Sequence, residues 1–124
     1  MREVGAPMKN GERLAIRRAY GDVANLTVGE LRVHRAGHAS PIQGSATRAE
    51  HRMCDRLVEI QGKREHELTD ADHELLARAV SRIHLLLRQR PEGPVRYSSW
   101  RRRLLLLGHD PLRADRDLKL GYSS

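Results

Sequence analysis

The chain has 124 residues, a formal net charge of +7, no phenylalanine and one cysteine. This length fits one domain, the single cysteine excludes an intramolecular disulfide, and the scarcity of aromatic residues disfavours a β-sandwich. The basic balance predicts attraction to polyanions, and no apolar run approaches the roughly 18 residues of a membrane span. We therefore expect a small all-α protein in the cytoplasm, with no membrane partner.

One helical domain flanked by two tails is the expected organisation. Residues 1–11 contain two glycines and a proline without hydrophobic periodicity, which predicts a flexible N-terminal tail. The domain is expected to cover residues 12–120, and residues 121–124 to form a C-terminal tail. Apolar spacing predicts a first short helix at 12–20, which Gly21 would end.

The segment after this first helix has two interpretations. Thr27 and Glu30 have the spacing of a capping box, which favours a second short helix at 28–36. Apolar residues also alternate here, so a strand hairpin at 23–37 stays open as the alternative. Residues 38–45 contain a proline, a glycine and two serines, which predicts a loop.

The centre of the chain is predicted to form an antiparallel helix hairpin. The first helix is expected at 46–61 and the second, which is the longest, at 69–90. Apolar residues of the second helix recur at the three-and-four spacing of an amphipathic helix, and Thr69 is suited to be its N-cap. The polar link at 63–67 is short enough to make the two helices neighbours.

The C-terminal quarter is predicted to add one more substantial helix. Two prolines and a glycine at 91–94 break the long helix. Ser98 or Ser99 can cap a new helix at 99–107, and Gly108 would close it. The fold expected from these elements is a small all-α bundle.

A basic cluster with an aromatic side chain at the start of this last helix is the strongest functional candidate. Its members are Arg96, Trp100, Arg101, Arg102 and Arg103. Guanidinium groups bind phosphates, and an indole ring can stack on a base, so the cluster predicts nucleic-acid binding. The competing interpretation is that Trp100 packs in the core while the arginines are solvated. Tyr97 lies just upstream.

A second, weaker candidate is a basic face on the predicted helix at 28–36. Arg32 and Arg35 share this face and could enter a major groove if the helices at 12–20 and 28–36 formed a helix-turn-helix. The connection between them is longer than the usual turn of that motif.

The last helix also contains a run of four leucines, which suggests a partner interface. Its members are Leu104, Leu105, Leu106 and Leu107. A helix that is apolar on every face must be buried on every face. Other helices of the chain, a second copy of the chain or another protein could cover it.

The histidines and the cysteine give little support for an enzyme. His66 and His73 are seven residues apart, so the sequence does not match the H-E-x-x-H zinc motif. No local cluster supplies the three or four ligands of a zinc site, and we expect no metal and no cofactor. Cys54 has His51 one turn away, but it lies beside an apolar stripe, which is typical of a buried cysteine.

The sequence therefore predicts a small, basic, non-enzymatic protein that binds nucleic acid or acts as a regulatory accessory factor. A bacterial or phage origin fits, and DNA is expected more than RNA. The first alternative is a protein–protein interaction or assembly module, such as an adaptor, an inhibitor or a virion component, that uses the helix at 99–107. The second is a metal-dependent enzyme.

Overall fold

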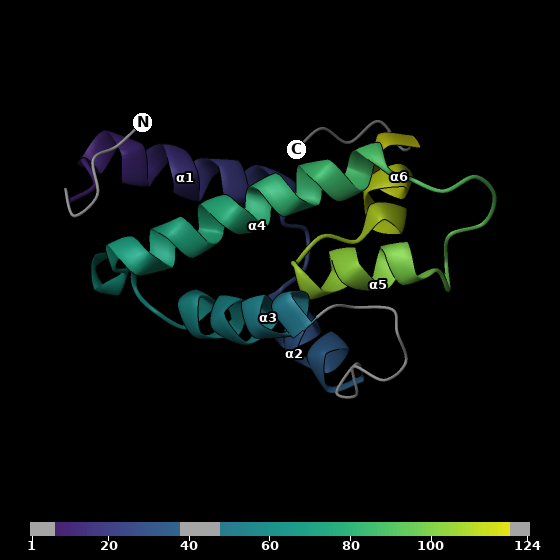
Figure 1. Ribbon diagram of the computed structural model, residues 1–124, viewed down its shortest axis with the longest axis horizontal. Helices are drawn as coiled ribbons and strands as arrows, with labels where there is room; N and C mark the ends of the chain where they lie inside the picture. Colours follow the sequence, from purple (N-terminus) through teal and green to yellow (C-terminus); the bar gives the residue numbers. More distant parts are fainter. Residues whose placement is uncertain (1–6, 38–47, 120–124) are drawn as a thin grey trace.

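The computed structural model describes residues 7–37 and 48–119, and this part of the chain is helical, with no strand (Figure 1). Its elements in chain order are α1 (Asn10–Val23), α2 (Val28–Gly37), α3 (Arg48–Gln61), the 3₁₀ turn η2 (Glu65–Glu67), α4 (Asp70–Arg88), α5 (Ser99–Leu106) and α6 (Pro111–Lys119). The predicted all-α bundle is confirmed. The loop expected at 38–45 and the tail expected at 121–124 lie outside the described residues.

Local capping motifs explain where two of the helices begin. At the start of α2, the Thr27 N–H donates to Glu30 Oε1 at 2.9 Å, and the Glu30 N–H donates to Thr27 Oγ1 at 3.1 Å. At the start of α4, Thr69 and Asp72 exchange the same pair of hydrogen bonds, both at 3.0 Å. Each motif satisfies two N–H groups that have no partner inside the helix. Residues 28–37 are therefore a helix, and the alternative of a strand hairpin is wrong.

The first helix and the N-terminal tail differ from the sequence prediction. Helix α1 continues through Gly21 to Val23, because its contact with α4 outweighs the weak helix propensity of one exposed glycine. Met8, which was expected in the N-terminal tail, packs on the domain, because it is only 6% exposed and its N–H donates to Asp70 Oδ2 at 3.1 Å. Residues 1–6 lie outside the described part.

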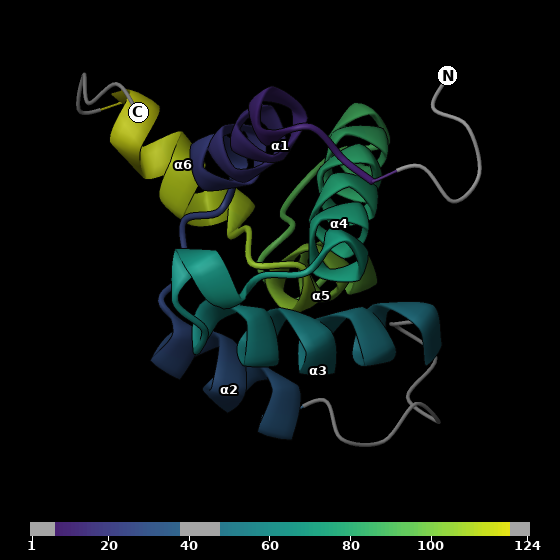
Figure 2. The same cartoon turned by 90° about the vertical axis from the view of Figure 1, so that its left-hand side faces the viewer.

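Helix α5 lies between α4 and the layer formed by α2 and α3 (Figure 2). Helix α1 lies along α4, and α2 lies under α3 on the far side of the bundle. Helix α5 contacts α2, α3 and α4. The fully buried residues of the core include Leu31, Leu57, Ile83, Leu104, Leu106 and Leu107. None of the described helices is both long enough and apolar enough to cross a bilayer.

The C-terminal end of α5 has the geometry of a Schellman motif. Gly108 has a φ of 95°, its N–H donates to the Leu105 carbonyl, and the His109 N–H donates to the Leu104 carbonyl. Gly108 was predicted to close this helix. A Cβ at this position would overlap the hydroxyl of Tyr20, which donates to the Leu107 carbonyl at 3.0 Å. This turn directs the chain into α6 and positions the site described next.

Candidate nucleic-acid interface

A basic pocket of about 660 Å³ lies where the start of α5 meets α6. The chain before α5 contributes Arg96 and Tyr97, α5 contributes Arg101, and the segment from Asp110 through α6 completes the pocket with Leu112, Arg113 and Arg116. Ser98 caps α5 by accepting a hydrogen bond from the Arg101 N–H at 3.1 Å. Four arginines and one aspartate therefore surround one cavity.

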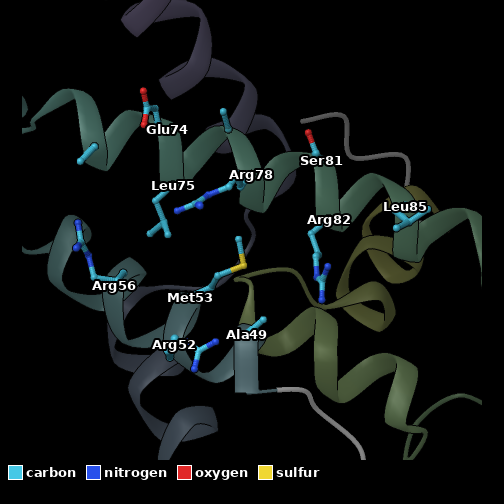
Figure 3. Close-up of a pocket in the computed structure, with 12 residues that line it drawn as sticks. Ala49, Arg52, Met53, Arg56, Glu74, Leu75, Arg78, Ser81, Arg82 and Leu85 are labelled. Atoms are coloured by element: carbon cyan, nitrogen blue, oxygen red, sulfur yellow. The ribbon is translucent and has the colours of Figure 1, made fainter. Parts of the chain in front are cut away.

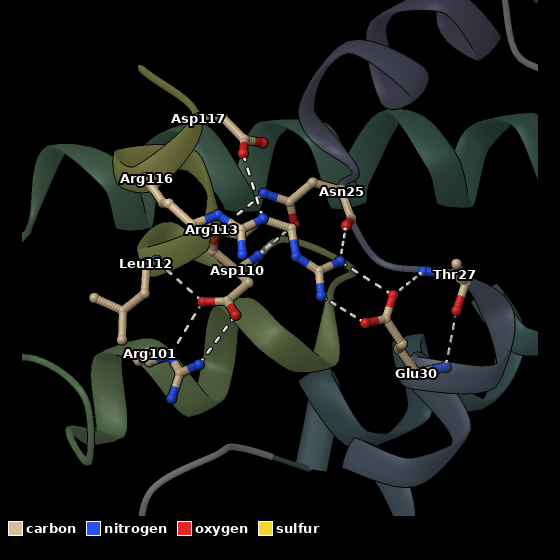
Figure 4. Close-up of polar contacts among 9 residues, drawn as sticks. All are labelled: Asn25, Thr27, Glu30, Arg101, Asp110, Leu112, Arg113, Arg116 and Asp117. Atoms are coloured by element: carbon tan, nitrogen blue, oxygen red, sulfur yellow. Dashed lines mark hydrogen bonds and ion pairs between the residues drawn. The ribbon is translucent and has the colours of Figure 1, made fainter. Parts of the chain in front are cut away.

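Asp110 holds the two helices of the pocket together (Figure 4). Its carboxylate accepts hydrogen bonds from Arg101 Nε at 3.1 Å and Arg101 Nη2 at 3.0 Å. It also accepts one from the Leu112 N–H at 3.0 Å, which caps the start of α6. Burial alone would raise the pKa of the Asp110 carboxyl, but these hydrogen bonds from Arg101 and Leu112 lower it below its ordinary value. Asp110 is therefore ionised and neutralises Arg101.

Asn25, in the segment between α1 and α2, fixes the backbone of Asp110. Its side-chain amide donates to the Asp110 carbonyl at 3.0 Å, and its side-chain oxygen accepts from the Asp110 N–H at 2.7 Å. The Asn25 carbonyl in turn accepts a hydrogen bond from Arg113 Nη1 at 2.6 Å. Residues 85 positions apart in sequence are thereby joined at the edge of the pocket.

Arg113 is paired with Glu30 at the start of α2. Arg113 Nη2 donates to Glu30 Oε2 at 2.6 Å, and Nη1 donates to Oε1 at 3.1 Å. The hydrogen bond from Arg113 lowers the pKa of the Glu30 carboxyl to about 2, so the pair stays ionised at neutral pH. Arg113, like Arg101, thus has its charge balanced by a carboxylate of the same chain.

The side chains of the pocket that remain available to a ligand are Arg96, Arg116 and Tyr97. Arg96 is exposed, and its guanidinium forms no ion pair with a described residue. Arg116 is exposed, and its ion pair with Asp117, its neighbour in sequence, is long, with 3.4 Å between Nη2 and Oδ1. The ring of Tyr97 is 81% exposed beside them. This combination can form salt bridges with phosphates and can stack on a base.

Trp100 is not available for stacking, contrary to the role proposed for it from sequence. It is only 7% exposed, and its indole N–H donates to the Leu86 carbonyl. The Arg90 guanidinium lies 5.3 Å from the ring centroid. Trp100 therefore packs in the core, and Tyr97 is the aromatic residue that the basic cluster presents to solvent.

The three consecutive arginines of α5 do not form one patch. Arg101 faces Asp110, whereas Arg103 donates from Nε to Glu50 Oε1 at 2.9 Å on the other side of the helix. Glu50 is completely buried, so Arg103 is held where it balances a core carboxylate. Arg102 is half-buried. Of the five residues predicted around this helix start, the structure brings Arg96 and Arg101 to the pocket.

The second basic group lies elsewhere and does not form a helix-turn-helix. Helix α1 packs on α4, while α2 packs on α3 and α5, so α1 and α2 are not a paired DNA-reading unit. Arg35 is held by Asp55 of α3, with Nε donating to Oδ1 at 2.8 Å. Arg32 is exposed.

The leucine run is enclosed by the chain itself. Leu104, Leu105, Leu106 and Leu107 are between 0% and 4% exposed. The run therefore presents no apolar face to a partner, because other helices of the same chain cover it. This corrects the expectation that these leucines anchor an interface.

The cysteine and histidines form no reactive constellation in the part of the chain that the structure describes. Cys54 is fully buried, and burial raises the pKa of its thiol to about 12. The thiol is therefore protonated at neutral pH, which does not suit a nucleophile. Among the described residues, no three histidine, cysteine, aspartate or glutamate side chains are grouped so as to hold a metal ion.

Sequence reasoning missed the contribution of α6. Arg113 and Arg116 follow Asp110 at the spacing of one helix face, and this was the one signal for them in the sequence. Comparisons with curated proteins and with solved structures give no significant match. One family model matches residues 19–105, which include Arg96, Tyr97 and Arg101 but end before α6. The chain therefore belongs to this family, described as proteins of unknown function (DUF3140).

Proposed function

We propose that this protein is a non-enzymatic nucleic-acid-binding protein whose contact site is the pocket between α5 and α6, with DNA as the first candidate ligand. The observation that carries the proposal is the grouping of an exposed tyrosine with two exposed arginines, Arg96 and Arg116, around one pocket. Polyanion binding also fits the net charge of +7.

The paired residues of the pocket support this function by fixing its shape. Arg101 and Arg113 are immobilised by carboxylates and backbone carbonyls, so α5 and α6 cannot separate without breaking these bonds. A ligand then finds Tyr97 and the available guanidiniums on a preorganised support, which reduces the entropy lost on binding. An exposed ring between cations favours a strand whose bases are unstacked, because a ring reaches a base most readily in single-stranded nucleic acid.

The test is fluorescence anisotropy of a labelled DNA strand of about 20 nucleotides, and of the matching duplex, at low and moderate salt. Each phosphate contact contributes about −0.7 to −0.9 to the slope of log affinity against log salt concentration. The double variant R96Q/R116Q is therefore expected to bind more weakly and to reduce the slope by about 1.5. Y97A should weaken binding of the single strand more than that of the duplex.

The matched control is R18Q/R88Q, which removes the same charge from two exposed arginines that lie outside the pocket and form no ion pair with a described residue. This control should keep the wild-type salt slope. If R96Q/R116Q and R18Q/R88Q behave alike, the binding is distributed over the whole surface, and the pocket is not the site.

A further inference from the structure

A second cavity, separate from the α5–α6 pocket, is a groove of about 790 Å³ between α3 and α4 (Figure 3). Its apolar lining includes Met53 of α3 and Leu75 and Leu85 of α4. The α4 side of the groove also has small side chains, such as Ala71 and Ser81, which leave space between the helices. Leu85 is 42% exposed. The groove therefore presents an apolar floor to solvent.

Two ion pairs between the walls frame this groove. Near the connection between the helices, Arg56 Nη2 of α3 lies 2.7 Å from Asp72 Oδ1 of α4. Farther along, Arg82 Nε of α4 lies 3.2 Å from Glu50 Oε1 of α3. Both carboxylates are buried, with side chains at most 1% exposed, so the pairs hold the spacing of the two helices.

Between these ion pairs, the two walls carry arginines without a carboxylate partner. Arg52 projects from α3 and Arg78 from α4, and neither forms an ion pair with another described residue. Figure 3 shows Arg78 and Met53 pointing into the space between the helices. Arg56 and Arg82 are balanced by buried carboxylates, so Arg52 and Arg78 supply the positive charge that the described rim presents above the apolar floor.

We infer that this groove binds an amphipathic helix with acidic flanks from a partner protein. Apolar residues on one face of such a helix would contact Met53 and Leu85, and carboxylates beside that face would pair with Arg52 and Arg78. Helix-in-groove recognition uses this combination of an apolar stripe and a charged rim. The groove extends along α4 from Ala71 to Leu85, about 21 Å at 1.5 Å per residue, which suits a helix of about 15 residues.

The charge of the rim and the apolar floor favour an acidic amphipathic helix over a second copy of this chain and over a nucleic acid. A second copy of the chain has a net charge of +7, so its docking would bring like charges together at the rim. A nucleic acid could satisfy the arginines, but its phosphates would leave the apolar floor without a partner. Among the described residues that line the groove, none has an aromatic ring on which a base could stack.

The experiment uses the full chain labelled with ¹⁵N and a synthetic helical peptide of about 15 residues, with leucines on one face and glutamates on both flanks. A matched peptide has lysine in place of every glutamate. We expect the acidic peptide to bind with a dissociation constant of roughly 10–100 μM and to shift amide resonances along α3 and α4. The lysine peptide should not bind.

Charge reversal then tests the arginines. R52E/R78E should weaken binding of the acidic peptide at least about tenfold, whereas R18E/R88E, with the same net charge, should change it by less than about twofold. Both double variants alter exposed side chains without ion pairs to described residues, so both should melt close to the wild-type temperature. Leu85→Glu should also weaken binding, because it places a carboxylate on the apolar floor.

Four results would overturn the inference. The first is no binding of the acidic peptide at about 1 mM. The second is an equal loss of affinity in the two double variants, which would mean non-specific attraction. The third is resonance shifts at the α5–α6 pocket in place of the groove. The fourth is displacement of the peptide from the groove by a DNA strand, which would assign the groove to nucleic acid.

Discussion

Replacing Asp110 by asparagine is expected to weaken the fold and strengthen nucleic-acid binding at the same time. The carboxylate accepts two hydrogen bonds from Arg101 and one from the start of α6. Hydrogen bonds to charged groups contribute about 1.5–3 kcal/mol each, and asparagine keeps one acceptor oxygen. We therefore expect a loss of about 2 kcal/mol in the free energy of unfolding, or a melting temperature about 6 °C lower.

The effect on binding has the opposite sign because the substitution removes the negative charge of Asp110, the one carboxylate among the described residues that line the pocket. For a phosphate about 7 Å from that position, the lost repulsion is about 0.6 kcal/mol at the dielectric constant of water, or about threefold in affinity. Fluorescence anisotropy with labelled DNA measures this gain in affinity, at low salt and at a temperature well below the melting points of the wild type and D110N.

D22N is the matched control, because it removes one negative charge from an exposed position on α1, outside the pocket. It should raise the affinity less than D110N does and leave the melting temperature nearly unchanged. If D110N and D22N bind DNA equally well, the phosphate does not lie near Asp110. That result would refute the assignment of the α5–α6 pocket as the site.

Three further predictions concern the scaffold. Gly108→Ala should cost at least about 2 kcal/mol in urea unfolding because of the positive φ, whereas Gly11→Ala, in open space, should be neutral or stabilising. Burial opposes ionisation of the Asp72 carboxyl, but the hydrogen bond from Lys63 lowers its pKa to about 2. The free energy of unfolding should therefore fall by roughly 2 kcal/mol from pH 4 to pH 2, as this carboxylate becomes protonated. Asp72→Asn should flatten that part of the plot of unfolding free energy against pH. Cys54 should react with a thiol reagent at pH 8 only in denaturant; reaction in the native state would contradict its burial.

The parts of the fold that local residues determine could be predicted from sequence. Thr27 with Glu30 and Thr69 with Asp72 lie three residues apart, so each capping box acts within a single turn of chain. Gly108 closes α5 in a Schellman motif, in which the Gly108 N–H donates to the Leu105 carbonyl and the His109 N–H donates to the Leu104 carbonyl. The end of α1 was placed wrongly at Gly21 because contact with α4, distant in sequence, extends that helix.

The candidate site could be predicted only in part, because its pairing partners are distant in sequence. Arg101 and Asp110 are nine residues apart across a turn, and Arg113 and Glu30 are 83 apart. No local sequence pattern indicates which arginine pairs with a carboxylate, so Arg101, Arg102 and Arg103 could not be distinguished from sequence alone. Trp100 was ambiguous for the same reason, since an indole ring suits both a core and a nucleic-acid contact.

The pairing of arginines explains how one basic chain can present two different surfaces. Most carboxylates in the described part are held by guanidiniums, and arginines without such a partner lie at both surfaces. At the α5–α6 pocket, Arg96 lies with Arg116 beside an exposed tyrosine, and between α3 and α4, Arg52 and Arg78 border an apolar floor. Because an aromatic ring accompanies the arginines at one surface and an apolar floor accompanies them at the other, the two surfaces suit different ligands. Substitutions at Arg96 and Arg116 should therefore leave peptide binding intact, and those at Arg52 and Arg78 should leave the specific DNA contact intact, so that either proposal can fail without the other.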